Sequence, residues 1–477
     1  MNIIICCNFY ARIYFAMIQS NNHNNWYLME LLTIIGGGLA GCEAAWQAAN
    51  RDIKVTLYEM RPFMETGAHS TNNLAELVCS NSLGSNLIDR ASGLLKEELR
   101  QLNSLLIDCA DKSKVPAGGA LAVDRQYFSD LIAEKFLSHQ NVNFTRKHVD
   151  HIPDSPTIIA SGPLTSNILS KEISELFGIN YLYFFDAIAP IVTFDSIDMN
   201  IAFRASRYDR NAGSTGDYIN CPFTQEQYDA FVDNLINSEK IQLKPYESDI
   251  IKGVNNNSHN FFESCLPVEE IAKRGHKALA FGPMRPIGLS NPHSNKKPKA
   301  IVQLRQDNKI GTLYNLVGFQ TNLTYPEQRR IFCMIPGLEN ANFVRFGQMH
   351  RNTFINSPSL LKKTLQSKLR PDIFFAGQLT GSEGYVGSIA TGLVAGINAA
   401  RYIKSTRFPT YPKETMIGSL IDYIINSDPG HFQPMKPNFG ILPNLENPPK
   451  SKRDRAKAYS SRSLSIMNEI SSRIVFE

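Results

Sequence analysis

The chain has 477 residues, of which 43% are hydrophobic and 19% are charged, and its formal net charge is +5. This length excludes a peptide or a disordered tail and predicts one large or two moderate domains, since a domain usually has about 150 residues. No apolar stretch reaches the roughly 18 to 20 residues of a membrane span, so a cytoplasmic enzyme fits. The mildly basic balance permits a polyanionic partner without requiring one.

Cysteine spacing argues against a metal site. The eight cysteines contain no CxxC pair, which predicts neither a zinc site nor a dense disulfide framework, and we expect reduced thiols. They are Cys6, Cys7, Cys42, Cys79, Cys109, Cys221, Cys265 and Cys333.

The first 28 residues do not have the pattern of a secretory signal. The apolar start lacks a basic n-region, Arg12 interrupts it, and no small-residue cleavage site follows. Because Met29 directly precedes the first predicted strand, it is a candidate for the true start. We therefore expect residues 1–28 to be a leader without a structural role.

Three segments predict pieces of a parallel sheet. Residues 31–50 (LLTIIGGGLAGCEAAWQAAN) predict a buried strand, a glycine turn and an alanine-rich helix, and residues 53–59 predict the next strand. Residues 156–173 and 372–403 repeat the order of strand, glycine turn and helix. The fold class is therefore α/β, with a Rossmann-like, doubly wound dinucleotide-binding domain built from distant parts of the chain.

The first glycine turn has the pattern of a pyrophosphate site. Gly36, Gly38 and Gly41 form G-x-G-x-x-G between strand and helix, where missing side chains permit a tight turn and close approach of the backbone to phosphate. Glu59 closes the second strand and can accept the ribose hydroxyls. The predicted cofactor-binding residues of this region are Gly36, Gly37, Gly38, Leu39, Ala40, Gly41 and Glu59.

A second glycine cluster favours FAD over NAD as the bound cofactor. It again follows an apolar strand and opens a helix, whose N-terminus can face an anionic group such as reduced flavin. One long ligand that runs from the first turn to the second fits better than two incomplete dinucleotide sites. From this cluster we predict Gly377, Gly384 and Gly387 as cofactor-binding residues.

The predicted domains follow from where these units lie. Residues 29–193 and 342–405 are expected to form the FAD-binding domain, and residues 194–341, which are richer in Asn and Pro, an inserted α+β domain facing the substrate. Residues 406–477 form a C-terminal segment, in which residues 450–462 carry six basic side chains and one acidic one. That basic run is either a solvated helix end or a contact for phosphates.

Two cysteines are candidates for catalysis. Cys79 lies in AELVCSNSLGSN and Cys221 in STGDYINCPFT, and both segments are expected to be loops. A loop thiol can be a nucleophile, but free cysteines are more often buried fillers, which is our reading of Cys42. Beside a reduced flavin, a thiolate suits addition to C6 of a uracil, which makes C5 a carbon nucleophile.

Two further segments combine arginines with aromatic residues, a mixture that can bind RNA through phosphates and base stacking. The alternative is that these two segments form ordinary protein surface with no role in RNA binding. The basic residues are Arg305, Arg329, Arg330, Arg345, His350 and Arg351.

Long blocks of the sequence resemble a known family. They include IIGGGLAGCEAAW, AELVCSNSL, PAGGALAVDRQYFS, NCPFT, FGPMRPIGL, QLRQDNKIGTLYNLVGFQTNL and FAGQLTGSEGYVGSIATGLVAG. From residue 31 to about residue 401, the chain resembles the TrmFO family of folate- and FAD-dependent tRNA (uracil-5-)-methyltransferases, among the GidA-like flavoproteins. One departure is Gly84, where an Arg is expected in many relatives.

The resemblance implies transfer of a one-carbon unit from 5,10-methylenetetrahydrofolate to C5 of a uridine at position 54 of the tRNA T loop. It implies FAD reduced by NADPH or NADH, and catalytic roles for Cys79 and Cys221, whose division of labour it leaves open. No metal is expected, and a monomer and a homodimer are equally compatible with the sequence.

Two alternatives remain at this stage. The same chemistry could act on a uridine of 23S ribosomal RNA, since nothing in the sequence reads the target loop. The second alternative is a different kind of flavoprotein, which either binds RNA without methylating it or acts as a thiol–flavin reductase. The absence of a CxxC pair argues against the reductase.

Overall fold

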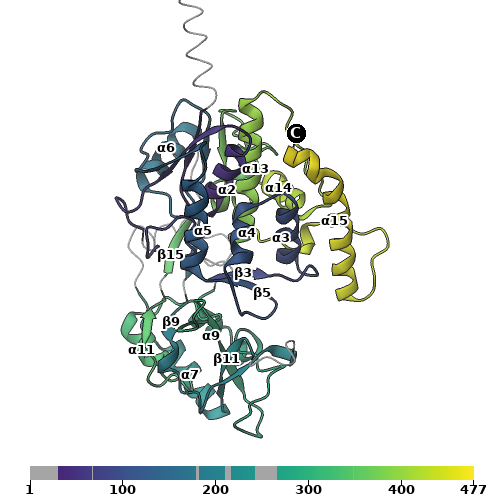
Figure 1. Ribbon diagram of the computed structural model, residues 1–477. Coiled ribbons are helices and arrows are strands. Elements are labelled where there is room, and N and C mark those ends of the chain that lie inside the picture. Colours follow the sequence, from purple (N-terminus) through teal and green to yellow (C-terminus); the bar gives the residue numbers. More distant parts are fainter. Residues whose placement is uncertain are drawn as a thin grey trace, which may run out of the picture.

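A computed structural model describes residues 31–476 with the exception of 67, 179–181, 188, 210–215, 242–265 and 348. The expected leader, residues 1–28, lies outside the described residues. The structure has two bodies, each with its own hydrophobic core, joined by a two-stranded antiparallel ribbon of β8 (Leu182–Ala187) and β15 (Met349–Phe354) (Figure 1).

The first body is built on a five-stranded parallel sheet, which confirms the predicted α/β class. Its strand order is β16-β7-β1-β2-β6, and every neighbouring pair is parallel. The order reverses beside β1, as in a doubly wound sheet. The strands are β1 (Leu31–Ile35), β2 (Lys54–Glu59), β6 (Val142–Arg146), β7 (Thr157–Ile159) and β16 (Ile373–Phe375).

Helices and a small antiparallel sheet surround these strands. The sheet has the order β3-β5-β4, with β3 (Ser82–Ser85), β4 (Lys114–Val115) and β5 (Ala120–Val123). The helical elements are α2 (Leu39–Ala49), α3 (Ala91–Gln101), α4 (Leu105–Lys112), α5 (Arg125–Leu137), α6 (Asn167–Phe177), α12 (Ser357–Leu360), η4 (Gly377–Thr380), α13 (Tyr385–Ile403), α14 (Met416–Asn426), η5 (Phe439–Ile441) and α15 (Lys452–Phe476).

The second body is a six-stranded antiparallel sheet with short helices. Its strand order is β10-β11-β12-β13-β9-β14. The elements are β9 (Ile191–Thr193), η1 (Phe194–Ser196), β10 (Phe203–Ala205), η2 (Arg207–Asp209), β11 (Tyr218–Phe223), α7 (Gln225–Ile236), α9 (Val268–Lys273), α10 (Ala278–Phe281), β12 (Ala300–Gln306), β13 (Leu313–Leu316), α11 (Tyr325–Phe332) and β14 (Phe343–Arg345). Strands β9 and β14, which are neighbours at one end of this sheet, lie just outside residues 194–341, and the predicted domain limits stay a prediction.

Helices α2 and α13 pack with their backbones in close contact. A Cβ atom added to Gly392 would lie 2.4 Å from the carbonyl oxygen of Ala40, and one added to Gly396 would lie 2.5 Å from that of Ala44. Real Cβ atoms do not approach backbone oxygens so closely, so the two glycines are required by this packing. Because each helix follows a strand of the parallel sheet, both helix N-termini lie at the same edge of that sheet.

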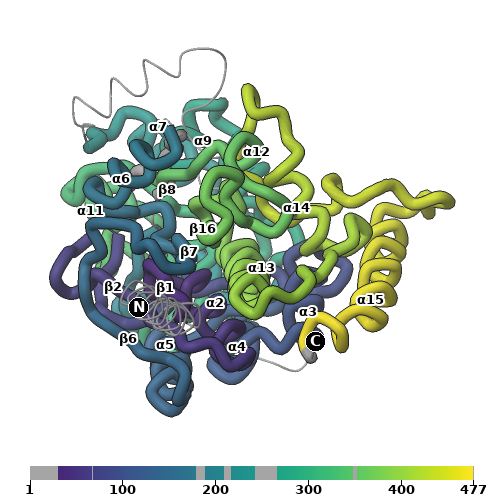
Figure 2. The backbone as a smooth tube through the Cα atoms, turned by 90° about the horizontal axis from the view of Figure 1, so that it is seen from above, coloured from purple at the N-terminus to yellow at the C-terminus, as the bar shows by residue number. Residues whose placement is uncertain are grey.

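A buried carboxylate holds the C-terminal helices on the first body. Glu98 of α3 is fully buried and accepts hydrogen bonds from the backbone N–H groups of Met416 (2.7 Å) and Ile417 (2.8 Å), at the start of α14, and from the hydroxyl of Ser463 in α15. Figure 2 shows α15 at the edge of the molecule beside α3. No helix in the described ranges is both long enough and apolar enough to cross a bilayer.

We expect the Glu98 carboxyl to make stability depend on pH. Burial raises the pKa of this carboxyl to about 7, so the folded state holds its proton over a range in which the unfolded state has lost it. Stability from this group is therefore complete below about pH 4.5 and is lost as pH rises to about 7. Relative to Glu98→Gln, the wild-type chain should lose about 2 kcal/mol between pH 5 and pH 7.5 in urea unfolding. Parallel pH curves would contradict this assignment.

Candidate functional site

The glycines of the first turn serve two different purposes. Gly36 has φ +112°, and an added Cβ would lie 2.5 Å from the carbonyl oxygen of Ala160; an added Cβ on Gly41 would lie 1.8 Å from the carbonyl oxygen of Gly36. These two glycines are required by the protein's own packing. Gly38 is different, because an added Cβ there would meet no atom within 4 Å. It lines a cavity, so its missing side chain leaves room for a ligand.

The N-terminus of α2 points its backbone donors toward that cavity. Gly38 is the N-cap residue, and α2 has no side-chain cap and no acidic residue in its first turn. Leu39 and Ala40 line the cavity beside Gly36 and Gly38, whereas Gly37 and Gly41 do not line it. A helix start with uncapped N–H groups and a partial positive charge suits a pyrophosphate.

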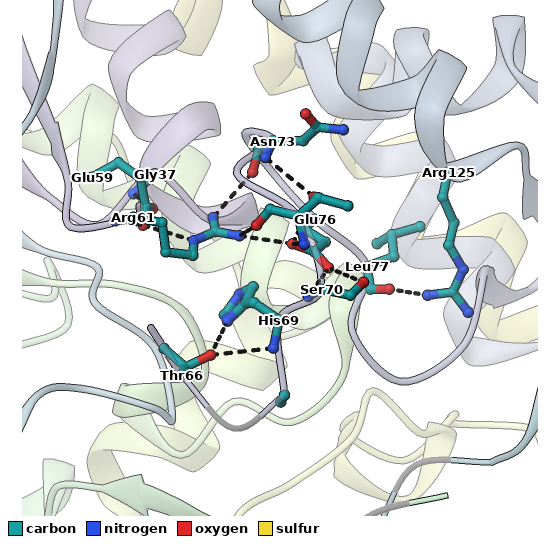
Figure 3. Close-up of polar contacts among 12 residues, drawn as sticks. Gly37, Glu59, Arg61, Thr66, His69, Ser70, Asn73, Glu76, Leu77 and Arg125 are labelled. Atoms are coloured by element: carbon teal, nitrogen blue, oxygen red, sulfur yellow. Dashed lines mark hydrogen bonds and ion pairs between the residues drawn. The ribbon is translucent and has the colours of Figure 1, made fainter. Parts of the chain in front are cut away.

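Glu59 ends β2 and lies beside the turn. Its Oε2 atom accepts the N–H of Gly37 (3.0 Å), and its Oε1 atom accepts the backbone N–H (3.0 Å) and the Nε–H (2.9 Å) of Arg61 (Figure 3). Burial alone would raise the pKa of this carboxyl, but the hydrogen bonds and charge of Arg61 outweigh burial and lower it. The group is therefore an ionised acceptor with lone pairs left for ribose hydroxyls.

Arg61 also fixes the loop that follows. Its guanidinium donates to Glu76 Oε2 (2.7 Å) and to the carbonyl oxygens of Thr71 (2.9 Å) and Asn73 (3.0 Å), while Glu76 accepts the N–H of Ser70 (2.8 Å) (Figure 3). These bonds hold residues 70–76 against the end of β2. Cys79, the predicted catalytic residue, follows three residues after this loop.

The second glycine cluster faces the same cavity. Gly377 has φ +76° after β16, and Gly384, with φ +86°, is the N-cap residue of α13, which has no side-chain cap. An added Cβ on Gly384 would meet only Lys436 Cε, at 3.9 Å. Gly377, Gly384 and Gly387 all line the cavity. Two uncapped helix starts thus meet at one site, as a ligand with a phosphate end and an anionic ring requires.

The cavity between the two turns has a volume of about 1460 Å³. Pockets for a drug-sized ligand usually have about 300 to 1,000 Å³, so this cavity is larger than one such ligand needs. Gly84 of β3 lines the cavity with φ +77°. The lining comes mainly from segments within residues 35–40, 58–61, 76–92, 147–149, 160–169, 377–388, 436–439 and 452–459.

Cys79 lines this cavity, on a loop as predicted. Its side chain is half-buried, and its backbone N–H donates to the hydroxyl of Tyr385 (2.8 Å), as does that of Ser80 (3.2 Å). Tyr385 is the first residue of α13. The candidate nucleophile is therefore held directly against the second glycine turn.

Three guanidinium groups interact electrostatically with Cys79. They belong to Arg125, Arg305 and Arg345. Arg125 donates to the carbonyl oxygen of Leu77 and forms an ion pair with Asp307 (3.1 Å). Nearby positive charge favours the thiolate, which is the nucleophilic form of cysteine. The arrangement suits covalent addition to an electron-poor carbon.

The arginines considered for RNA contact divide into three groups. Arg305 is buried and donates to Asn81 Oδ1 (2.9 Å), and Arg345 donates to the carbonyl oxygen of Ala68 (3.2 Å), so both serve the site rather than open surface. Arg329 and Arg330 are exposed on α11. The side chains of His350 and Arg351 lie outside the part of the chain that the structure describes.

The expectation of a loop at Cys221 is wrong. Cys221 lies within β11, its side chain is fully buried in the core of the second body, and burial raises the pKa of its thiol. The following Pro222 does not prevent a strand here. It is tolerated in the strand because β10 pairs only with residues 218–220 and ends before it. The structure does not bring Cys221 to the cavity of Cys79.

Sequence reasoning missed two residues of the site, Tyr385 and Arg125. Tyr385 is the only aromatic residue between Gly377 and the second turn of α13, and that contrast was the available signal. Arg125 begins α5 far from the glycine turns and had no local signal. No group of three or more potential metal ligands occurs among the described residues.

Comparison with known proteins gives the family. The model of the family "Glucose inhibited division protein A" matches residues 31–407. The methylenetetrahydrofolate–tRNA-(uracil-5-)-methyltransferase TrmFO of Natranaerobius thermophilus is 54% identical over 92% of this chain and 98% of its own length. The protein of the same name from Bacillus pumilus is 53% identical over 93% and 99%.

A solved structure shares the fold at low sequence identity. GidA of Aquifex aeolicus in its form I crystal superposes with a TM-score of 0.63 at 15% identity, over 93% of this chain and 77% of that one. On the family model and the two relatives, the chain belongs to the glucose inhibited division protein A family and, within it, to the TrmFO proteins.

Proposed function

We propose that this protein transfers a one-carbon unit from 5,10-methylenetetrahydrofolate to C5 of a uridine in tRNA, at position 54 of the T loop. Reduced FAD is the reductant, and NADPH or NADH supplies its electrons. The names of the relatives support folate, tRNA and the uracil C5 position. The observation that carries the proposal is that Cys79 lies in one cavity with both glycine turns.

The residues present fit FAD. The uncapped start of α2 suits its pyrophosphate, the ionised Glu59 its ribose hydroxyls, and the uncapped start of α13 the anionic end of its reduced ring. Gly38 and Gly384 leave open space where a side chain would stand against the ligand. When bound there, the flavin supplies the two electrons that turn a methylene into a methyl group.

The chain's own chemistry centres on Cys79. Its thiolate adds to C6 of the uracil, and the electrons of the C5–C6 double bond move toward C5 and O4. C5 is then the nucleophile that forms a bond to the methylene carbon, while the bond between that carbon and the folate nitrogen breaks and the folate leaves. The guanidinium groups of Arg125 and Arg345 favour the thiolate before addition. Loss of the C5 proton and departure of the thiolate from C6 then restore the double bond.

A direct role for Cys221, the second cysteine that the resemblance implies, requires another conformation. In the structure, its thiol faces the core of the second body. The proposal for the covalent step therefore rests on Cys79. The enzyme is proposed to act in the cytoplasm, where its tRNA substrate is made, as a monomer or a homodimer.

The proposed reaction is tested directly with labelled cosubstrate. Purified protein is incubated with unmodified tRNA, NADPH and methylenetetrahydrofolate labelled at the methylene carbon, and nucleosides are analysed by mass spectrometry. We expect labelled 5-methyluridine in the T loop and none in ribosomal RNA treated in the same way. Unlabelled 5-methyluridine, or none at all, would refute the folate route.

Replacing Cys79 should remove turnover and spare cofactor binding. For Cys79→Ala we expect a loss of at least about a thousandfold in methyl transfer, since the covalent step is removed, with FAD content and melting temperature close to wild type. Cys333→Ala is the matched control, because Cys333 is also half-buried but does not line the cavity. Turnover by Cys79→Ala within tenfold of wild type would rule out the covalent role.

Replacing Glu59 should weaken FAD binding. Glu59→Gln keeps the shape of the side chain and removes the charge that faces Arg61 and the ribose, which predicts FAD binding about 10- to 100-fold weaker in flavin fluorescence titration. Glu65→Gln is the control, since Glu65 is exposed on the neighbouring loop and does not line the cavity. Equal affinities of the two variants would contradict the ribose contact.

Replacing Cys221 separates packing from chemistry. Cys221→Ala leaves a small cavity in the second core and should destabilise the protein by about 1 kcal/mol in urea unfolding. An unchanged stability would contradict the packed position. Turnover of the Cys221→Ala variant is measured on the same sample, under conditions in which the protein is folded. A loss of turnover larger than the unfolded fraction explains would show that this thiol takes part in the reaction, and β11 would then have to expose it.

A further inference from the structure

One end of the cavity is lined by a cluster of basic side chains that the proposed FAD site does not use. We call it the basic rim and define it as Arg90, Lys436, Lys452, Arg453 and Arg455. Its last three members belong to the start of α15. The family model ends at residue 407, so most of the rim comes from a part of the chain beyond that match.

The basic rim begins where the second glycine turn ends. Lys436 Nζ forms an ion pair with Glu383 Oε1 (2.9 Å), one residue before the N-cap Gly384 of α13. From there the rim extends to the start of α15, which is fixed beside residues 88–90. The hydroxyl of Ser460 donates to the carbonyl oxygen of Ile88 (2.5 Å). A ligand stacked next to the flavin end can therefore continue directly onto the rim.

The charge of this region favours an anion. Its acidic lining residues are Glu383, paired with Lys436, and Asp89, which lies 3.5 Å from Arg90 and 3.6 Å from Arg453. Within the described ranges, the side chains of Lys452 and Arg455 form no ion pair, although both line the cavity. The N-terminal end of α15, a helix of 25 residues, adds partial positive charge at the same place.

Aromatic rings lie among these cations. Phe439 and Tyr459 both line the cavity and stack on each other, with ring centroids 5.7 Å apart and an interplanar angle of 17°. The guanidinium of Arg462 lies over the Tyr459 ring, 5.3 Å from its centroid. Flat apolar surfaces beside uncompensated cations suit a ligand in which an aromatic ring is followed by several carboxylates.

We propose that the basic rim binds the p-aminobenzoyl and poly-γ-glutamate part of the folate cosubstrate, so that the enzyme prefers polyglutamylated methylenetetrahydrofolate. The inference rests on the proposed function, which requires the methylene carbon of the folate to reach the flavin and Cys79, and we therefore place the pterin at the flavin end of the cavity. The aminobenzoyl ring then reaches Phe439 and Tyr459. Each added glutamate contributes one more carboxylate toward Lys452 and Arg455.

RNA phosphates share this anionic chemistry, but the position of the rim favours the folate tail. The basic side chains line the same cavity as Gly384 and Cys79, so a ligand already stacked at the flavin end reaches them within that cavity. The poly-γ-glutamate tail of folate is also a long, thin chain, which can leave the cavity along the start of α15. Binding of RNA is treated as an outcome of the test.

The test compares folates that differ only in tail length. The FAD-loaded full chain is titrated with tetrahydrofolate monoglutamate and pentaglutamate, and the change in flavin absorbance gives each dissociation constant. We expect the pentaglutamate to bind about tenfold more tightly in the wild type. In the double variant Lys452→Gln/Arg455→Gln that ratio should fall to about two, because the pentaglutamate loses more affinity than the monoglutamate does.

Lys457→Gln is the matched control, because Lys457 is exposed on the same helix but does not line the cavity; it should keep the wild-type ratio. Melting temperatures check that all variants are folded. Equal binding of the two folates by the wild type would overturn the rim assignment while leaving the proposed function intact, since monoglutamate still binds. Binding of neither folate would overturn both. An unchanged folate ratio with a raised KM for tRNA in the double variant would assign the rim to RNA and overturn the proposal.

Discussion

The backbone contact between α2 and α13 is the constraint on which the site depends. Gly392 and Gly396 let α13 lie against Ala40 and Ala44 at distances that no side chain permits. Each helix starts at a glycine turn after a parallel strand, so the position of one helix start fixes the other. Two segments far apart in the sequence thereby line one cavity, which is what a ligand as long as FAD needs.

A second chain of contacts ties the thiol to this frame. Glu59 binds Arg61, Arg61 binds Glu76, and the segment that follows is held through the carbonyl oxygen of Leu77 by Arg125 (Figure 3). Arg125 in turn pairs with Asp307 of the second body. The group proposed to bind ribose and the proposed nucleophile thus belong to one polar network, which extends between the two bodies. A substitution in the loop can therefore affect catalysis without touching a ligand.

The local parts of this site were predictable from the sequence, and the tertiary parts were not. The turn at Gly36–Gly41 and Glu59 follow from the spacing of glycines and apolar residues within one βαβ unit. Tyr385, the burial of Arg305 and the placement of the basic run on α15 at the cavity depend on packing between segments that no local pattern connects. From the sequence, the basic run of residues 450–462 could be either solvent-exposed or phosphate-binding. Only the folded structure shows which of its side chains face the cavity: Lys452 and Arg455 line it, whereas Lys457 does not.

The two cysteines differ because of the alternation of a β-strand. Along β11, Cys221 shares its face with Ile219 and Phe223, which belong to the second core, whereas Asn220 points to the opposite face and accepts a hydrogen bond from Gln303 Nε2 (2.9 Å). A shift of β11 by one residue would turn Cys221 to the opposite face of the sheet, where Asn220 is now buried, but would also turn Asn220 into the apolar core and Ile219 out of it. A buried amide without a hydrogen-bond partner costs about 1 to 3 kcal/mol, so a one-residue shift of β11 is energetically unfavourable. The thiol beside the glycine turns needs no such change, because α13 already holds its backbone, and Cys79 is therefore the residue on which the covalent step rests.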